Sequence, residues 1–283
     1  MTSAERPSQQ NLLRSHGVKP TKKRGQNFLI DGNLARAIAS DVMVLGSDVL
    51  ELGAGGGALT RPMLDAGARV LAVEVDRGLC GLLRSELADE PRFTLHEGDI
   101  ARLDWAALLA EAGDRPVMAG NLPYELTSEV LFALADHRER SAGGVFMVQR
   151  EVAQRLASGP GSKVYGVLSV LMGSLFEIEL VRQVPSNVFW PRPDVQSAIV
   201  RLTHNGDVWE REEFLGFKDV IKSLFTHRRK QLSRILRTRL GGDADAAREV
   251  LTAAGIAHGD RPEQVDRRRL RELARHVMEW ENT

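Results

Sequence analysis

The sequence predicts an α/β fold, in which a mostly parallel, doubly wound sheet is followed by a small all-helical domain. Short apolar segments alternate with helical patterns as far as Leu202, which is typical of such a sheet. A glycine-rich segment, residues 53–57, directly follows the first of these strand-like segments. Beyond Leu202, apolar residues recur only at helical spacing.

The composition limits the class of protein. The chain has 283 residues, of which 43% are hydrophobic, so it can bury a sizeable core. It contains no run of about 18 apolar residues, and residues 1–10 lack the apolar stretch of a secretory signal. The single cysteine, Cys80, excludes an internal disulfide and a cysteine-built zinc site, and the seven histidines show no metal-ligand spacing. We therefore expect a cytoplasmic protein that spans no membrane and binds no metal.

The first domain is expected to cover residues 18–204, after a flexible polar tail of residues 1–17. Asp31 is a good N-cap for a first helix, because apolar residues recur at helical spacing from there to Val42. The predicted strands are residues 49–52, 70–75, 93–96, 116–119, 145–148, 174–181 and 198–202. Helices are expected between them, notably at residues 58–66, at 79–87 and after Thr127. Such sheets bind ligands beyond the carboxyl ends of their strands.

The second domain, residues 205–283, is expected to be helical. Residues 205–207 are turn-like, and residues 221–240 carry an apolar face that basic residues interrupt. Residues 265–278 then have the pattern of an amphipathic helix.

Two clusters of basic residues stand out against a net charge of zero. The first comprises Lys19, Lys22, Lys23 and Arg24. The second, within residues 218–239, has eight Lys and Arg residues against one acid, Asp219. One such cluster is often a solvated helix face, but two of them, on a chain with nucleotide-binding signals, indicate a nucleic-acid partner.

The glycine-rich segment, which follows Glu51, contains Gly53 and Gly55 where a strand turns into a helix. Glycine lets the backbone turn tightly and approach a ligand, where a Cβ atom would collide. Such loops bind NAD, FAD or S-adenosylmethionine, and some are tight turns without a ligand.

Carboxylates after the next two strands narrow this choice. Glu74 lies about 20 residues beyond the glycine loop, where an acid accepts hydrogen bonds from ribose hydroxyls, while Asp76 is placed to cap the next helix. Asp99 follows the third strand, where it is placed either to accept a bond from an adenine amine or to form a surface turn. These acids disfavour a pyrophosphate-bearing cofactor and suit S-adenosylmethionine, whose sulfonium is cationic.

The most specific segment, Asn121, Leu122, Pro123 and Tyr124, directly follows the fourth strand. An amine on a purine is a poor nucleophile, because its lone pair is delocalised into the ring. The Asn121 side-chain oxygen and the Leu122 carbonyl are expected to accept hydrogen bonds from the two N–H groups of this amine. Pro123 keeps the Leu122 carbonyl out of a helix. Tyr124 is expected to stack on an extruded base. The alternative is a proline turn with Tyr124 in the core, which the upstream signals disfavour.

On these residues the chain resembles the KsgA-type ribosomal RNA adenine dimethyltransferases, which are related to the Erm macrolide-resistance methylases. The resemblance implies a Rossmann-like class I methyltransferase sheet that binds S-adenosylmethionine. Residues 23–31 resemble the family's N-terminal motif, in which Asn27 and Leu29 would contact the cofactor and Gly25 and Gln26 would form a closing loop.

The same resemblance implies that residues 51–55 contact the methionine end of the cofactor, Glu74 its ribose and Asp99 its adenine, with Asn121 serving both cofactor and base. The chain departs from the family at Gly56 and Gly57, which make the loop richer in glycine.

Residues 188–197 resemble the family's Phe-x-Pro-x-Pro-x-Val-x-Ser segment, which implies that Phe189 is a second stacking residue opposite Tyr124. The alternative is a proline-stiffened loop in which Phe189 and Trp190 are core aromatics. Gln196 stands where an acid is common. Residues 227–232 resemble the basic motif that opens the family's helical domain. The residues expected to contact RNA are Lys22, Lys23, Arg24, His227, Arg228, Arg229 and Lys230.

Three functions remain open at this point. The first is N6,N6-dimethylation of two adjacent adenines near the 3′ end of 16S rRNA, with a 30S assembly intermediate of the small ribosomal subunit as partner. The second is an Erm-like methylation of 23S rRNA, and the third is a non-catalytic assembly factor. The basic motif and the Phe189 segment favour the first, while Glu74, Asp99 and Asn121 argue against the third. A NAD oxidoreductase would leave residues 121–124 unexplained. No unclaimed apolar helix face stands out, so we expect a monomer.

Overall fold

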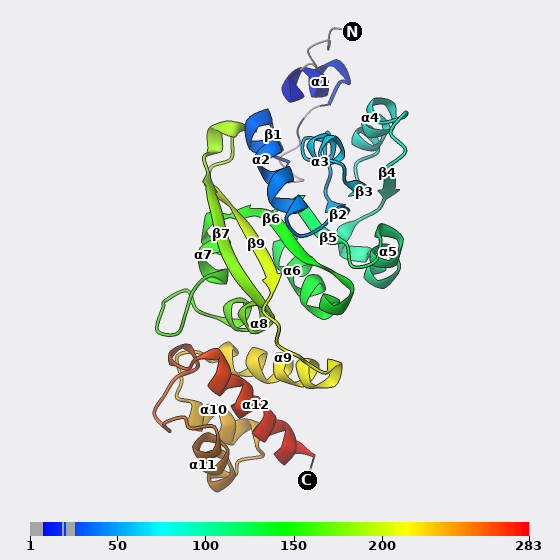
Figure 1. Ribbon diagram of the computed structural model, residues 1–283. Helices are drawn as coiled ribbons and strands as arrows, with labels where there is room; N and C mark the ends of the chain where they lie inside the picture. The colour runs from blue at the N-terminus through cyan, green and yellow to red at the C-terminus, as the bar shows by residue number, and fades with distance from the viewer. Residues whose placement is uncertain (1–7, 19, 21–25, 283) are drawn as a thin grey trace. The chain divides into compact units, whose positions relative to one another are not determined.

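The computed structural model describes residues 8–18, 20 and 26–282, so the predicted sites at Lys22, Lys23, Arg24 and Gly25 lie outside the described residues. The chain divides into two compact units (Figure 1). One contains residues 1–153 and 178–204, and the other contains residues 154–177 and 205–283. Among the described residues, no helix is both long and apolar enough to cross a membrane.

The first unit is built on a seven-stranded sheet with the strand order β4-β3-β2-β5-β6-β9-β7. Its strands are β2 (Asp48–Leu52), β3 (Arg69–Glu74), β4 (Phe93–Glu97), β5 (Val117–Asn121), β6 (Gly143–Gln149), β7 (Phe176–Val184) and β9 (Ser197–His204). The pairs β4-β3, β3-β2, β2-β5 and β5-β6 are parallel, and β6-β9 is antiparallel. The predicted mostly parallel sheet is therefore confirmed, and each predicted strand corresponds to one of its members.

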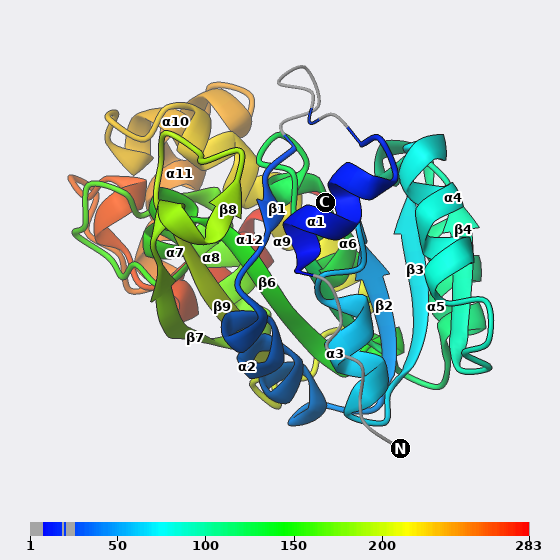
Figure 2. The same ribbon diagram turned by 90° about the horizontal axis from the view of Figure 1, so that it is seen from above.

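Helices cover both faces of this sheet (Figure 2). They are α2 (Gly32–Met43), α3 (Thr60–Asp65), α4 (Arg77–Glu86), α5 (Trp105–Ala112), α6 (Thr127–Asp136) and α7 (Arg150–Leu156). Asp31 caps α2 as predicted, because its carboxylate accepts from the Leu34 amide at 2.9 Å. Ile38 and Val42 of α2 are fully or almost fully buried in one core with strand residues such as Val70 and Val145. This burial on both faces explains why the parallel strands are nearly continuous apolar runs.

The N-terminal region differs from the prediction of a flexible tail. Residues Gln9–Ser15 form helix α1, whose N-cap Ser8 accepts from the Asn11 amide. Leu13 is completely buried, which holds this short helix against the sheet unit. The polar composition of residues 1–17 did not indicate that burial.

Two very short strands also escaped prediction. β1 (Phe28–Leu29) pairs antiparallel with β8 (Phe189–Trp190). This ribbon joins the N-terminal motif to the proline-containing segment from the far end of the same unit.

The second unit is helical, as predicted, and also includes a segment expected to be partly strand. Its helices are α8 (Val167–Leu175), α9 (Arg211–Thr226), α10 (Leu232–Arg239), α11 (Ala244–Ala253) and α12 (Arg267–Glu281). The predicted strand from Ser174 begins instead at Phe176, because Ser174 and Leu175 complete α8. The sequence analysis predicts residues 154–177 in the first domain, whereas the structure groups them with the helices.

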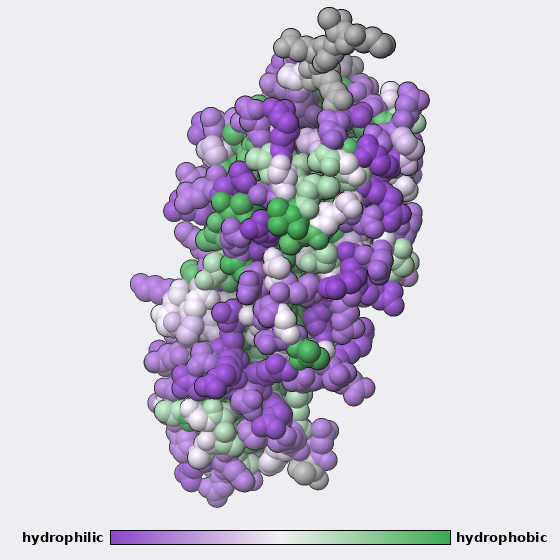
Figure 3. Space-filling view, viewed as in Figure 1, coloured by the Kyte–Doolittle hydropathy of each residue, from purple (hydrophilic) through white to green (hydrophobic). Residues whose placement is uncertain are grey.

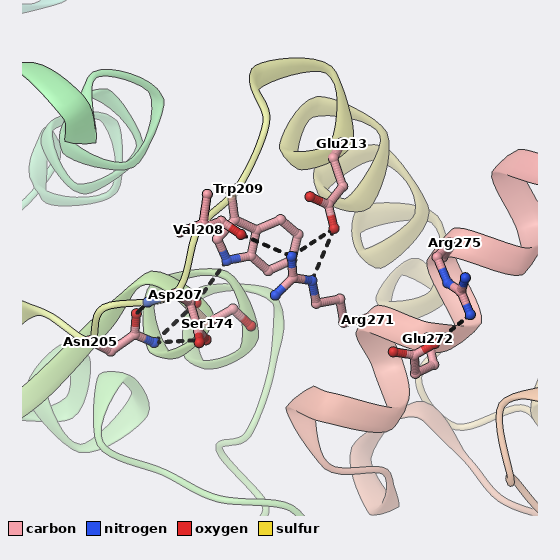
Figure 4. Close-up of polar contacts among 9 residues, drawn as sticks. All are labelled: Ser174, Asn205, Asp207, Val208, Trp209, Glu213, Arg271, Glu272 and Arg275. Carbon is pink, nitrogen blue, oxygen red and sulfur yellow. Dashed lines mark hydrogen bonds and ion pairs between the residues drawn. The ribbon is translucent and has the colours of Figure 1, made fainter.

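A polar and aromatic cluster around Trp209 ties α8, α9 and α12 together (Figure 4). The Trp209 indole nitrogen donates to the Ser174 carbonyl at 3.2 Å, and the Arg271 guanidinium lies 3.7 Å from the indole ring centroid. Arg271 also donates to Glu213 of α9 and to the Val208 carbonyl. A cation stacked on a buried indole and paired with a carboxylate holds three elements in one arrangement. These contacts account for the grouping of α8 with the C-terminal helices.

Candidate active site

A cavity of about 390 Å³ opens at the carboxyl ends of four adjacent parallel strands, β4, β3, β2 and β5. The sequence analysis expected a ligand at this edge of the sheet. All the residues predicted to bind the cofactor line this cavity, namely Gln26, Asn27, Leu29, Glu51, Gly53, Gly55, Glu74, Asp99 and Asn121. Leu122, Pro123 and Tyr124 line it as well.

The charge of the cavity is one-sided. Its lining includes the carboxylates of Glu51, Glu74, Asp99 and Glu125, and no Lys, Arg or His is found among the described residues that line it. Ionised acids such as Asp99 and Glu125 in a concave, partly apolar site attract a cation and repel phosphate. The cavity therefore suits a positively charged ligand.

The glycine loop lies where β2 turns toward α3. Gly53 and Gly55 have φ angles of +71° and +58°, in the left-handed region that side chains with a Cβ rarely adopt. The amides of Gly53 and Ala54 both donate to the Val73 carbonyl, at 2.9 and 3.1 Å. The loop is thereby fixed to β3, next to Glu74.

Glu51 is the most deeply buried acid of the cavity, with 1% of its surface exposed. Its carboxyl accepts a hydrogen bond from the Thr60 hydroxyl at 2.6 Å. Burial raises the pKa of Glu51 to about 8; the Thr60 bond lowers it, and the nearby Glu74 raises it further. In the absence of a ligand, this carboxyl therefore keeps its proton at neutral pH.

Glu74, at the end of β3, is held by the backbone. Its carboxylate accepts from the amides of Gly55 at 2.8 Å and of Val75 and Asp76 at 2.9 Å. Burial raises its pKa more than these three bonds lower it. Asp76 caps α4 as predicted, by accepting from the Gly78 and Leu79 amides. The two acids of this strand end thus have different tasks, and Glu74 is the one that faces the cavity.

Asp99 lies beyond β4, where it lines the cavity and also caps a short 3-10 turn. Its carboxylate accepts from the Ala101 amide at 3.1 Å. The turn interpretation and the ligand interpretation of Asp99 are therefore compatible, because one carboxylate oxygen serves the turn.

The Asn121 side chain ends β5 and reaches the N-terminal motif. Its amide nitrogen donates to the Asn27 carbonyl at 2.9 Å. The amide nitrogen being engaged there, the side-chain oxygen is the group left to accept a bond from a substrate amine. This is the atom that the predicted mechanism uses.

Tyr124 is held by a contact with a residue that is distant in sequence. Its hydroxyl lies 3.2 Å from the hydroxyl of Ser197, which is buried at the start of β9. The Pro123 carbonyl accepts from the Leu126 amide and the Thr127 hydroxyl, so residues 123–127 lead directly into α6. Tyr124 is partly exposed on the cavity lining rather than in the core.

The prediction that Phe189 stacks opposite Tyr124 is not met in this structure. Only 4% of Phe189 is exposed, it is absent from the cavity lining, and it packs in the sheet core with Leu29. β8 pairs with β1 and turns this ring inward, so the ring has no free face to offer a base.

The predicted RNA-contacting residues His227, Arg228, Arg229 and Lys230 lie in the helical unit, after α9, and all four are exposed. Arg228 is partly engaged, because it donates to the Lys163 carbonyl and pairs with Glu263 at 3.4 Å.

The sequence analysis did not predict two residues of the cavity that make contacts within the protein. Phe28 and Gly56 both line it. Phe28 stands between two predicted residues, Asn27 and Leu29, so the motif itself was a signal, whereas nothing in the sequence showed what Gly56 contacts.

The chain is similar in sequence to ribosomal RNA methyltransferases. A family model described as ribosomal RNA adenine dimethylase matches residues 17–271. The chain is 41% identical over 270 residues to "Ribosomal RNA small subunit methyltransferase A" of Anaeromyxobacter sp. (strain K), covering 91% of this chain and 93% of the relative. It is 39% identical over 264 residues to the protein of the same name from Syntrophotalea carbinolica, covering 92% and 97%.

Two solved structures are similar. The 23S rRNA methyltransferase ErmE has a TM-score of 0.64 at 25% identity and covers 89% of this chain and 100% of its own. A dimethyladenosine transferase from Plasmodium falciparum has a TM-score of 0.69 at 21% identity, with 87% and 96% covered, and this likeness concerns the fold. Because the family model spans most of the chain and the relatives match over nearly their whole length, this chain belongs to the ribosomal RNA adenine dimethylase family.

Proposed function

We propose that this protein transfers methyl groups from S-adenosylmethionine to the N6 amines of two adjacent adenines near the 3′ end of 16S rRNA. One observation carries the proposal: a single cavity is lined both by the strand-end acids and by residues 121–124. The relatives named as small-subunit methyltransferases support the choice of rRNA.

The lining fits the cofactor by its chemistry. When bound, S-adenosylmethionine supplies an electrophilic methyl group on a cationic sulfonium. Glu74 would accept from its ribose hydroxyls, Asp99 from its adenine amine, and the loop from Glu51 to Gly55 would hold its methionine end. The described residues that line the cavity include acids but no Lys, Arg or His, which suits a positively charged cofactor.

The chain's own contribution to the reaction is positioning and polarisation. The Asn121 oxygen and the Leu122 carbonyl accept hydrogen bonds from the amine. These bonds stabilise the positive charge that develops on the nitrogen. The Tyr124 ring, anchored through Ser197, provides the face on which the base stacks. Holding the amine in line with the methyl group supplies much of the rate, and the methylated nitrogen then releases one proton to solvent, so no strong general base is needed.

We further propose a particle of the small ribosomal subunit as the partner and a monomeric enzyme. Exposed cations at residues 227–230 of the helical unit are available for the RNA backbone. Figure 3 shows a largely hydrophilic face with apolar side chains in small separate groups. Exposed apolar residues such as Val44, Val208 and Leu215 come from different elements, which does not suggest a large self-association surface.

A second candidate is methylation of 23S rRNA. It is favoured by the likeness to ErmE, a 23S rRNA methyltransferase, over the full length of that structure. The higher identity to relatives named for the small subunit weighs against it.

The test is methyl transfer from tritiated S-adenosylmethionine to 30S particles that lack this modification and, in parallel, to 23S rRNA. We expect label in the 30S particles, recovered as N6,N6-dimethyladenosine near the 3′ end of 16S rRNA. Label in 23S rRNA alone would favour the second candidate. Absence of label in both would contradict the proposal and favour a non-catalytic assembly factor.

A further inference from the structure

We propose that helix α1 (Gln9–Ser15) belongs to the cofactor site, with Gln9 and Leu13 as positioning residues of the glycine loop. The family model begins its match at residue 17, so it does not cover this helix. The inference rests on the proposal that the cavity binds S-adenosylmethionine.

The contact between α1 and the loop is direct. The Gln9 side-chain amide donates to the Gly56 carbonyl at 2.7 Å, across 47 positions of sequence. A Cβ atom at Gly56 would lie 2.5 Å from Nε2 of Gln9 and 2.7 Å from Cδ2 of Leu13. Both distances are shorter than real Cβ contacts, so a side chain at position 56 would force the ends of the Gln9 and Leu13 side chains to shift. Gly56, where the chain departs from the family pattern, thus lies in direct contact with α1.

Leu13 extends this contact to the cavity wall. It is fully buried in a cluster with Phe28, Leu79 and Leu82. Phe28 and Leu79 line the cavity, and the Phe28 ring lies 3.5 Å from the position that a Cβ at Gly55 would occupy. Leu13 thus packs behind two cavity side chains as well as against the loop.

A second anchor holds the other side of α1. The Arg14 guanidinium lies 5.5 Å from the ring centroid of Trp190, and Trp190 packs against Phe28 with ring centroids 6.4 Å apart. Trp190 belongs to β8, which pairs with β1. α1 is therefore fixed between the glycine loop and the β1-β8 ribbon.

These contacts have a consequence for binding. A loop that is ordered before the ligand arrives loses less conformational entropy when it binds. α1 is too short to be stable by itself and depends on this packing. Loosening α1 should therefore release the glycine loop and weaken cofactor binding without touching any group that contacts the cofactor.

The test uses the full chain and S-adenosylhomocysteine, with its affinity measured by isothermal titration calorimetry. We expect Leu13→Ala and Leu13→Asp to weaken binding, the latter by about tenfold or more. Asn11→Ala, on the exposed face of the same helix, is the matched control and should bind like wild type. In the ligand-free protein, hydrogen exchange of the amides of residues 53–57 should accelerate in Leu13→Ala and stay unchanged in Asn11→Ala.

Gly56→Ala separates this inference from a direct effect on the ligand. If its Cβ acts by displacing α1, the double variant Gly56→Ala with Leu13→Ala should bind no more weakly than the poorer single variant. Additive losses, or Leu13 variants that bind within twofold of wild type, would overturn the inference while leaving the proposed function intact. A wild-type protein that does not bind S-adenosylhomocysteine would overturn both.

Discussion

The side-chain amide of Asn121 donates to the backbone carbonyl of Asn27 at 2.9 Å, although 94 positions separate the two residues. This bond joins the end of β5 to the N-terminal motif just before β1. It engages the amide nitrogen of a residue that lines the cavity and leaves the amide oxygen as the acceptor. The predicted catalytic residue is thus oriented by a residue that was itself predicted to contact the cofactor.

The buried carboxyl of Glu51 should make stability depend on pH. Its pKa is about 8 in the folded protein and 4.5 in its ordinary state, so between these values the folded chain binds more protons than the unfolded chain. The free energy of unfolding contributed by Glu51 is therefore largest below about pH 4.5 and is lost as the pH rises through 8. Urea unfolding of the ligand-free protein from pH 5 to 8.5 should show this decline, and Glu51→Gln should flatten it.

The matched control for that series is Glu111→Gln, which removes an exposed acid on α5. It should keep the wild-type slope. If Glu51→Gln and wild type lose stability in parallel over the whole range, Glu51 is ionised throughout and the raised pKa is wrong.

The ring of Tyr124 should matter more than its hydroxyl. Tyr124→Ala is expected to lower kcat/KM for the RNA particle by about ten- to a hundredfold, the range for losing one base-stacking contact. Tyr124→Phe keeps the ring and loses only the 3.2 Å contact with Ser197, so its loss should be much smaller. Steady-state kinetics with both variants would decide, and equal losses would argue for a role of the hydroxyl in place of stacking.

Cations of the helical unit should set the salt dependence of RNA binding. Arg229→Glu combined with Lys230→Glu is expected to weaken binding of the RNA. The slope of the logarithm of the association constant against the logarithm of the salt concentration should become less steep by about one for each lost phosphate contact. Arg228 is left intact because its bonds to Lys163 and Glu263 serve the fold.

Arg248→Glu, an exposed charge reversal on α11, is the control for that experiment. Filter binding across a salt series would measure both. A double variant with the wild-type slope would mean that residues 229 and 230 are merely solvated.

The sheet could be predicted because its inner strands, such as β2 and β5, are short, apolar and buried on both faces, a pattern that the sequence carries by itself. The acids Glu74 and Asp99 could be predicted for a related reason: parallel strands bring their carboxyl ends to one edge. Helix α1 could not, since its segment has two leucines among polar residues and owes its stability to Leu13 packing behind Phe28.

The features that the sequence analysis did not predict depend on tertiary contacts. A two-residue ribbon such as β1-β8 has no periodicity to detect, and its pairing decides that Phe189 points into the core. The α8 boundary was misplaced because a short apolar run is compatible with both helix and strand. The raised pKa of Glu51 depends on burial, which the sequence does not display.

The central claim is that the acceptor oxygen of Asn121, in this cavity, promotes methylation of adenine in small-subunit rRNA. Its most direct test is the single-turnover rate of N6-methyladenosine and N6,N6-dimethyladenosine formation in unmodified 30S particles, for wild type and Asn121→Ala, at saturating S-adenosylmethionine. We predict that the wild type forms the dimethylated product and that Asn121→Ala is slower by about a hundredfold or more, as expected for losing one transition-state hydrogen bond. A variant that methylates the particles at nearly the wild-type rate would contradict the account.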